Sequence, residues 1–410
     1  MPEDSLSRRT LFFVNIAHAF DHFVLLIYPT AVIAIAAEWG LDYSSLIRLA
    51  TGAFVAFGLC SLPMGWLADR LGRRNLLAVF FLGYGACCVG LTRAGTSFSL
   101  AGWLLALGVF SAIYHPIGSA MLVTHARQLG RDLGWNGVWG NLGAASASAV
   151  TAALTAAFGW RAAFALPGIV CMACGIAFLL AVRGDGNAAP RAASARPAPN
   201  PSRPIAMLAV FAIAIIAGGM TFNVTTISMP KVIDEKLGLD LSLAWTGSLA
   251  TGVFIFGALT QLAVGRLVDR LGLPTLFVGL AMLQPIGLGV AATTSGVSLL
   301  FGLFLVTAAI YGQVVVNDAM VARYVPAAYR AKAFSVRYFL GFTASGFAAQ
   351  MIAWLHARGG FSTVLAATAA FGATVLACAL LFKFLADGAA SNRAISAGIV
   401  RASPVRADGS

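Results

Sequence analysis

Apolar residues occur along this chain in long runs that are separated by short polar segments. A helix that crosses the ~30 Å hydrocarbon core of a bilayer needs about 20 mostly apolar residues. Runs of that length recur throughout the chain and predict twelve membrane-spanning helices, at 11–37, 46–68, 75–92, 99–124, 135–158, 162–182, 205–230, 243–267, 274–293, 298–322, 332–355 and 361–385.

Two segments fall outside this pattern and set the predicted organisation of the chain. Residues 183–204 are rich in Pro, Ala and Arg and contain nothing that could bury a core, so we expect a flexible cytoplasmic linker. The chain then divides into a six-helix bundle at 1–182, this linker, a second six-helix bundle at 205–386 and a flexible cytoplasmic tail at 387–410.

Composition excludes a water-soluble globule. Hydrophobic residues make up 59% of the 410 residues, mean hydropathy is +0.85, and 10% are charged, whereas soluble domains carry about a quarter charged residues. The N-terminus is polar and leads into a run long enough to span, so we expect no cleaved signal peptide. The six cysteines lie in apolar runs, which favours small buried residues over a redox or metal site.

The distribution of basic residues predicts the orientation. Most Lys and Arg residues lie in the segments on the N-terminal side of the membrane. The segments on the other side hold six basic residues: Arg48, Arg93, Arg161, Lys231, Lys236 and Arg358. One more, Arg337, lies within a predicted helix. The positive-inside rule then places both termini in the cytoplasm. It also explains the net charge of +12 without nucleic acid, and indicates a bacterial-type inner membrane.

The two predicted bundles are copies of one unit. Segment 49–54, Leu-Ala-Thr-Gly-x-Phe, recurs at 249–254, and Asp-Arg-Leu-Gly at 69–72 recurs at 269–272 with the same offset. Parallel six-helix repeats related by an axis along the membrane normal are typical of one class of secondary transporter.

The polar stretch GWLADRLGRR at 65–74 joins two predicted helices on the cytoplasmic side. Gly65 allows helices to approach closely, Gly72 permits a tight turn, and Asp69 can interact with a helix N-terminus. The alternative is that the segment supplies positive charge for topology only. That alternative explains the arginines but leaves Asp69 and the glycines without a role.

This stretch resembles the signature of the major facilitator superfamily, and GRLVDRLGLP at 265–274 is a degraded second copy. The resemblance implies an all-α membrane protein with twelve helices in two six-helix halves around a substrate path. It also implies a cytoplasmic gate formed by Gly65, Asp69, Arg70, Gly72, Arg73, Asp269 and Arg270.

A closer resemblance is to the fosmidomycin-resistance branch of that superfamily. Its residues here are His-Ala-Phe-Asp at 18–21, Ile-Tyr-Pro at 27–29, Tyr-His-Pro at 114–116 and Gly-Asn-Leu-Gly at 140–143. The chain departs from that branch at Phe20 and Ile117, where Asn and an acid are usual. The resemblance implies export of a small, partly polar compound by proton antiport.

Of the fifteen acids, Asp21 and Asp318 lie well within predicted spans. Ionisable groups in a membrane are costly and mark candidate functional sites. Asp21 is about ten residues into its helix, ~15 Å deep at 1.5 Å per residue. With His18, His22 and His115 at similar depth it predicts a proton-coupling site. A fixed structural pair and a metal site are the alternatives.

Other polar side chains predict a substrate cavity. Asp318 and Arg337 lie at equal depth, and we expect an ion pair because an unpaired Arg there would be costly. It is either purely structural or binds an anionic group. The remaining candidates are Tyr28, Tyr114, Asn141, Asn223, Tyr311, Gln313 and Asn317.

The sequence therefore predicts a proton-coupled, alternating-access exporter of a small solute. Proton-coupled uptake of an organic anion is the main alternative, with metal-ion transport or a non-transporting membrane receptor as others. We expect a monomer in contact with membrane lipid, with a small-molecule substrate and protons as partners, no cofactor, no bound metal and no enzymatic activity, since no nucleophile–base pair or nucleotide motif is evident.

Overall fold

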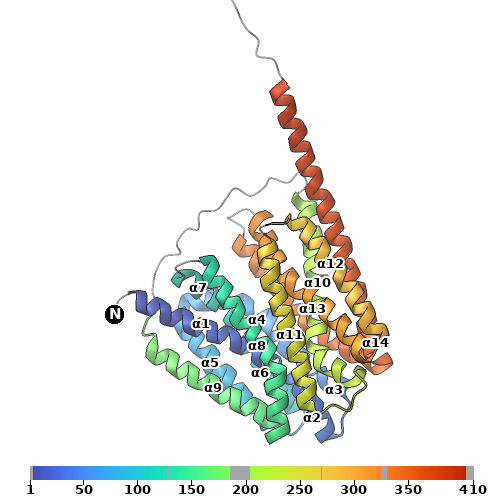
Figure 1. Ribbon diagram of the computed structural model, residues 1–410. Coiled ribbons are helices and arrows are strands. Elements are labelled where there is room, and N and C mark those ends of the chain that lie inside the picture. The colour runs from blue at the N-terminus through green and yellow to red at the C-terminus, as the bar shows by residue number, and fades with distance from the viewer. Residues whose placement is uncertain (1–2, 127–128, 185–203, 269, 325–329, 403–410) are drawn as a thin grey trace, which may run out of the picture.

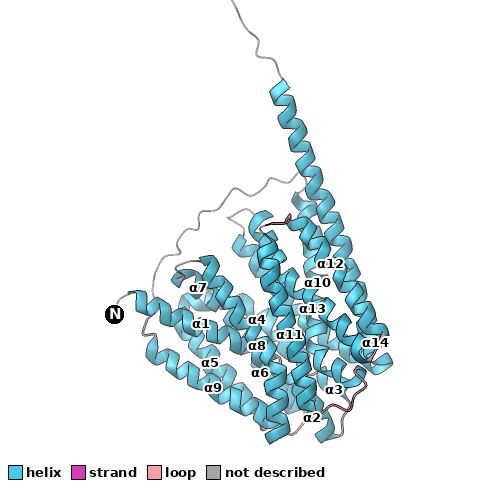
Figure 2. Ribbon diagram, in the orientation of Figure 1, coloured by secondary structure: helices cyan, strands magenta, loops and turns pink. Residues whose placement is uncertain are grey.

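The computed structural model describes residues 3–126, 129–184, 204–268, 270–324 and 330–402, and its regular secondary structure there is helical (Figures 1 and 2). In chain order the helices are α1 (Glu3–Leu25), α2 (Ile27–Trp39), α3 (Tyr43–Ile47), α4 (Ala50–Leu71), α5 (Arg73–Leu91), α6 (Ser97–Ser111), α7 (Tyr114–His125), α8 (Leu129–Phe158), α9 (Trp160–Ala181), α10 (Pro204–Lys236), α11 (Leu243–Leu267), α12 (Leu273–Thr293), α13 (Gly296–Tyr324) and α14 (Arg330–Ala402).

Eleven segments of the described chain are long and apolar enough to cross a membrane, and the last of them accounts for two spans. Phe339–Ala386 has 48 residues, which would measure ~72 Å as a straight helix and cannot fit one bilayer crossing. The chain turns at Gly359 and Gly360, where Gly360 has φ +60°, a conformation that only glycine adopts readily. The prediction of twelve spans is confirmed.

Two spans of the first half are broken near their centres, which the hydrophobic pattern did not predict. The span 11–37 is divided at Leu26 between α1 and α2, and 99–124 is divided at residues 112–113 between α6 and α7. Proline lacks a backbone N–H and its ring clashes with the carbonyl four residues earlier. Pro29 and Pro116 follow the two breaks by three or four residues and account for them.

The helices form two groups, which we call the first half (α1–α9) and the second half (α10–α14) (Figure 1). The halves meet along two related seams, α4 on α14 and α8 on α11. The repeated Leu-Ala-Thr-Gly segment lies in both, at the start of α4 and within α11. Thr251 Oγ1 accepts a hydrogen bond of 3.0 Å from the Ala149 N–H. The sequence repeat thus marks the contacts between the halves.

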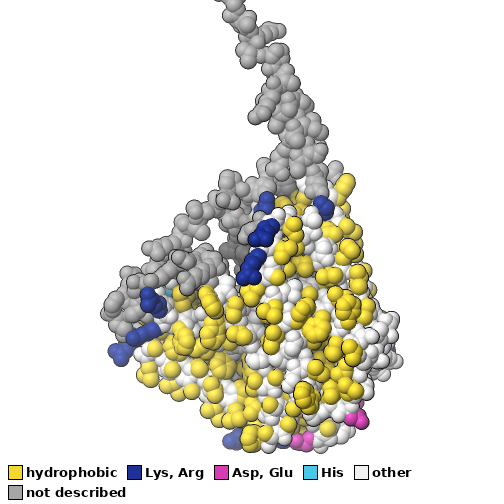
Figure 3. Space-filling model, viewed as in Figure 1, with side chains coloured by type: hydrophobic (Ala, Val, Ile, Leu, Met, Phe, Trp, Pro, Cys, Tyr) yellow, Lys and Arg dark blue, Asp and Glu magenta, His cyan; other side chains and the backbone are white. Residues whose placement is uncertain are grey.

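Charge on the surface agrees with the predicted orientation. Figure 3 shows Lys and Arg concentrated towards the end of the molecule that carries the N-terminus and the far end of α14, with Asp and Glu at the opposite end. We call these the cytoplasmic and outer ends.

The linker residues 185–203 lie outside the described residues. Within 387–410, for which the sequence predicts a flexible tail, α14 continues as a helix to Ala402.

Candidate functional site

Asp21 is at the centre of a polar cluster inside the first half. It is the sixteenth residue of the span Leu6–Trp39, and its side chain is 0% exposed. One carboxylate oxygen, Oδ1, accepts a hydrogen bond of 2.6 Å from the Ser111 hydroxyl, and Oδ2 lies 3.3 Å from His115 Nε2. Tyr84 donates its hydroxyl to the Asp21 carbonyl oxygen at 3.1 Å. His115 lies in the first turn of α7, directly after the break between α6 and α7.

His18 and His22 form a second pair beside this one. His18 Nδ1 lies 2.7 Å from the Asn136 carbonyl oxygen, which can only accept, so Nδ1 carries a proton. In the neutral ring Nε2 is then an acceptor, and it lies 3.1 Å from His22 Nε2. His22 Nε2 is therefore the donor in the hydrogen bond between the two rings. His22 Nδ1 can take up one excess proton while this bond stays intact.

The two pairs are in direct contact. The ring centre of His115 lies 5.5 Å from that of His18 and 5.6 Å from that of His22, both edge to face. His115 is 10% exposed on its side chain, and His18 and His22 are partly exposed. The four predicted proton-coupling residues are therefore gathered into one continuous cluster that runs from partly exposed rings to the buried carboxylate.

Neighbouring polar residues that the sequence did not single out hold the cluster in place. Asn136 donates to Asn15 Oδ1 at 2.9 Å and to the Tyr114 hydroxyl at 3.1 Å. The Tyr114 ring stacks on His18 at 4.9 Å. Asn136 and Ser111 are polar residues within largely apolar spans, and this was the signal that could have identified them. Tyr114, predicted in the substrate cavity, is buried in this support.

Two glycines of α8 make room for the cluster. A Cβ atom on Gly140 would lie 2.6 Å from His18 Nε2, and one on Gly143 would lie 2.1 Å from the Ala19 carbonyl oxygen. Both distances are shorter than van der Waals contact. The Gly-Asn-Leu-Gly segment therefore allows α8 to lie directly against α1 and against the His18 ring.

The three histidines also have the composition of a metal site. One ligand nitrogen from each lies within 4.8 Å of the others, and imidazole is a common ligand of transition metals. However, His18 Nε2 and His22 Nε2 already bond to one another and His18 Nδ1 to Asn136. Hydrogen bonding accounts for the arrangement of the rings, and the proton-coupling role of the cluster stays a prediction.

The second half carries polar pairs that join its helices. Arg337 donates to Asp318 Oδ1, as the equal depth of the two residues predicted. The Arg337 side chain is 11% exposed and that of Asp318 is 43% exposed. Gln284 donates to Gln313 Oε1 within the core of this half, where both residues are buried.

The other predicted cavity residues are spread over several places. Asn223 donates to the Gly341 carbonyl at 3.1 Å, and Asn141 donates across the seam between the halves to Gln261 Oε1 at 2.6 Å. Tyr311 is buried against Phe222, and the Tyr28 hydroxyl is buried and donates to the Leu46 carbonyl at 2.6 Å. Asn317 is partly exposed on α13. Their roles in substrate binding stay predictions.

The cytoplasmic motif forms contacts within the first half. Arg73 donates to Thr124 Oγ1 at 3.0 Å, Arg74 to the Leu179 carbonyl at 2.8 Å, and Arg70 lies over the Trp66 ring. Gly72 has φ +81°, as its predicted turn requires. The surroundings of Gly65, the side chain of Asp69 and the whole of Asp269 lie outside what the structure describes, and Arg270 is exposed. The gating role stays a prediction.

Comparison with known proteins decides the family. The sequence model of the family described as Major Facilitator Superfamily matches residues 11–317 and 211–405 of this chain. The chain belongs to this superfamily. The resemblance seen in the signature at 65–74 is therefore confirmed, while the finer resemblance to the fosmidomycin-resistance branch stays a prediction. As a superfamily member it is a multi-pass inner-membrane protein with the fold of transporters.

Its relatives are similar over part of their length. The chain is 28% identical over 176 residues to the membrane sensor protein UhpC of Escherichia coli, covering 41% of this chain and 39% of the relative. It is 27% identical over 164 residues to a probable L-galactonate transporter of the same organism, covering 39% and 35%. The match thus spans about two fifths of these relatives. A crystal structure of a variant of peptide transporter POT in complex with alafosfalin has a TM-score of 0.73 at 15% identity, over 94% of this chain and 99% of the other, which shows the shared fold.

Proposed function

We propose that this protein is a proton-coupled secondary transporter of a small, partly polar solute, and that Asp21 with His115 carries the coupled proton. The supporting observation is the wholly buried Asp21 carboxylate, 3.3 Å from His115, in the middle of its span. A lone charge at that depth is costly. An acidic side chain kept at that depth, beside an imidazole that can exist with or without a charge, is expected of a site that changes its charge during each cycle.

The surroundings suggest how the proton moves. Asp21 is faced by His115 from α7, by Ser111 from α6, by Tyr84 from α5 and by the neighbouring His22 on its own helix. Protonation of the carboxylate removes the buried charge, and protonation of His115 converts it to an ion pair. The pair of His18 and His22 can hold one excess proton, so the cluster can pass protons towards Asp21 one at a time.

Export is the proposed direction, on the strength of the resemblance to the fosmidomycin-resistance branch. In antiport, protons that enter the cell drive the solute outwards. Alternating access supplies the exchange: the two halves rock around the mid-membrane region and expose it to one side at a time.

Uptake of an organic anion with protons is a second candidate, favoured by a different observation. Arg337 is a largely buried cation, and its partner Asp318 is nearly half exposed. Substrate carboxylate or phosphate could replace Asp318 as its partner, as bidentate recognition by Arg allows. A relative named as a probable L-galactonate transporter points to the same class of solute.

Flux in proteoliposomes tests both candidates. A thermal-shift screen with fosmidomycin, L-galactonate and glucose 6-phosphate, followed by a wider panel, identifies a ligand. Its transport is then measured with and without a pH gradient, with a pH-sensitive dye in the lumen. Protons moving against the solute indicate antiport, and protons moving with it indicate symport. A transport rate that is the same with and without the pH gradient contradicts proton coupling. Binding without any flux would favour a receptor, the role that the name of the sensor relative suggests.

A further inference from the structure

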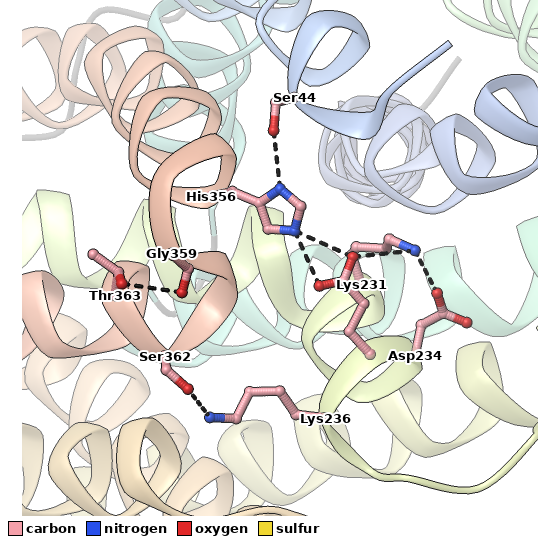
Figure 4. A network of polar contacts seen from close by, with 9 residues as sticks. Ser44, Lys231, Asp234, Lys236, His356, Gly359, Ser362 and Thr363 are labelled. Carbon is pink, nitrogen blue, oxygen red and sulfur yellow. Dashed lines mark hydrogen bonds and ion pairs between the residues drawn. The ribbon is translucent and has the colours of Figure 1, made fainter. Parts of the chain in front are cut away.

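A small polar network joins the two halves at the outer end of the molecule, remote from the proton site. The short helix α3 of the first half carries Tyr43 and Ser44 against the second half, where Tyr43 meets α10 and α14. Figure 4 shows Ser44 pointing towards His356 of α14. Ser44 Oγ lies 2.9 Å from His356 Nδ1. Tyr43 and Ser44 are buried and the His356 side chain is 16% exposed, so this bond is partly shielded from water.

Tyr43 adds packing to the same contact. Its ring centre lies 5.2 Å from that of His356 and 5.9 Å from that of Phe361, and the Lys231 ammonium lies 5.9 Å above the ring. Asp42 starts α3 as its N-cap, accepting from the Ser45 N–H at 2.8 Å. The hydrogen bonds from the Ser45 side chain and N–H lower the pKa of the Asp42 carboxyl. The N–H bond, which caps α3, does not involve the Ser45 side chain.

The second half holds the His356 ring from its other side. His356 Nε2 lies 3.0 and 3.1 Å from the two oxygens of Glu235. Glu235 lies 3.4 Å from the Lys231 ammonium, which bonds to Asp234 at 2.6 Å. The Glu235 carboxylate thus lies beside a cation one turn away on the same helix, and its two contacts with His356 fix the direction in which the imidazole points.

The hydrogen-bonding roles in this network are determined by its partners. A carboxylate accepts only, so His356 Nε2 carries a proton. Nδ1 then accepts from the Ser44 hydroxyl in the neutral ring and donates to it in the charged ring, because a hydroxyl can do either. The bond between the halves therefore survives a change of charge on His356. It depends on the position of Ser44 and on the orientation that Glu235 gives to the ring.

We propose that Ser44, His356 and Glu235 form an outer latch, which holds the outer ends of the two halves together and must open for the site to face outwards. Ser44 and His356 form the bond across the seam, and Glu235 is a positioning residue. This inference rests on the proposed transport function, since a latch matters where the halves rock. It concerns the opening of the outer end and is independent of which ion is coupled.

Spin labels on the two halves test the latch without a substrate or a gradient. Phe98→Cys and Val297→Cys place labels on exposed residues at the outer starts of α6 and α13, in full-length protein whose six native cysteines are replaced. Pulsed electron spin resonance then gives the distribution of distances between the outer ends. One lost hydrogen bond should raise the ratio of open to closed outer ends by about two- to tenfold. We expect this increase for Ser44→Ala and His356→Ala.

The matched control is Ser45→Ala, one residue along the same helix. The Ser45 hydroxyl bonds to Asp42 of its own turn, so the distance distribution should be that of the wild type. Glu235→Gln provides a second test that keeps the side-chain shape, and should open the outer end by a smaller factor than His356→Ala. An unchanged distribution in Ser44→Ala protein of normal thermal stability overturns the latch. That outcome leaves proton coupling at Asp21 intact, which flux measurements test separately.

Discussion

The two halves of this protein derive from one repeated sequence but differ where chemistry is expected. In the first half Pro29 and Pro116 break two spans, and the breaks adjoin Asp21 and three histidines. In the second half α10 runs unbroken through Pro230, and α13 has valines at 315 and 316, where the offset of the repeat places the counterparts of His115 and Pro116. The comparison leads us to predict that coupling chemistry is concentrated in the first half, while the polar pairs of the second half keep their charges.

The largest expected effect comes from Asp21→Asn. If Asp21 carries the coupled proton, this change should abolish gradient-driven accumulation, because the site no longer exchanges its charge. Exchange between preloaded vesicles should survive, since it requires no net proton movement. Radiolabelled solute in proteoliposomes measures both.

Asp318→Asn is the matched control in the second half and should keep a dependence of transport on the pH gradient. An Asp21→Asn protein that loses exchange, accumulation and thermal stability together would indicate a structural role. If its uphill transport keeps the wild-type pH dependence, Asp21 has no part in coupling.

A smaller effect is expected from Gly140→Ala, which adds one methyl group against the His18 ring. The new Cβ would lie 2.6 Å from His18 Nε2, so the ring or α8 must shift, at a cost of about 1–3 kcal/mol. We expect a lower melting temperature and a displaced pH profile of transport. Gly137→Ala, on the same helix but facing open space, should change neither. Equal effects of the two changes would show that the His18 contact is unimportant.

Pro116→Ala tests whether the helix break itself matters. The new backbone N–H at 116 could bond to the Ala112 carbonyl and favour a continuous helix, which would move His115 away from Asp21. If the continuous helix becomes about 1 kcal/mol more favourable relative to the broken one, transport should slow about fivefold. Pro230→Ala, within the continuous α10, should have little effect on the transport rate. Similar rates in both variants would remove the break from the mechanism.

The sequence predicted most of the fold and part of the site, for identifiable reasons. Spans follow from apolar length alone, and Asp21 and His115 stand out because charge is rare at that depth. The helix breaks were missed because proline also occurs inside continuous helices, as Pro63, Pro167 and Pro285 do here. Ser111 and Asn136 were missed because one polar residue in an apolar span has several roles available to it. The outer latch joins residues 44 and 356, a pairing that no local pattern contains.

The ion pair of the second half gives the smallest expected effect and the sharpest test of its fixed character. Asp318→Ala takes the carboxylate away from Arg337, a largely buried cation, whereas Arg337→Ala leaves Asp318, which is nearly half exposed and can be hydrated. We therefore expect Asp318→Ala to lower the melting temperature more. The double variant should be less impaired than the sum of the two, with a coupling of about 0.5–3 kcal/mol. Strict additivity of the unfolding free energies would mean that the pair contributes nothing.

A change in proton stoichiometry in either variant would contradict the division of roles between the halves, because the pair would then take part in coupling.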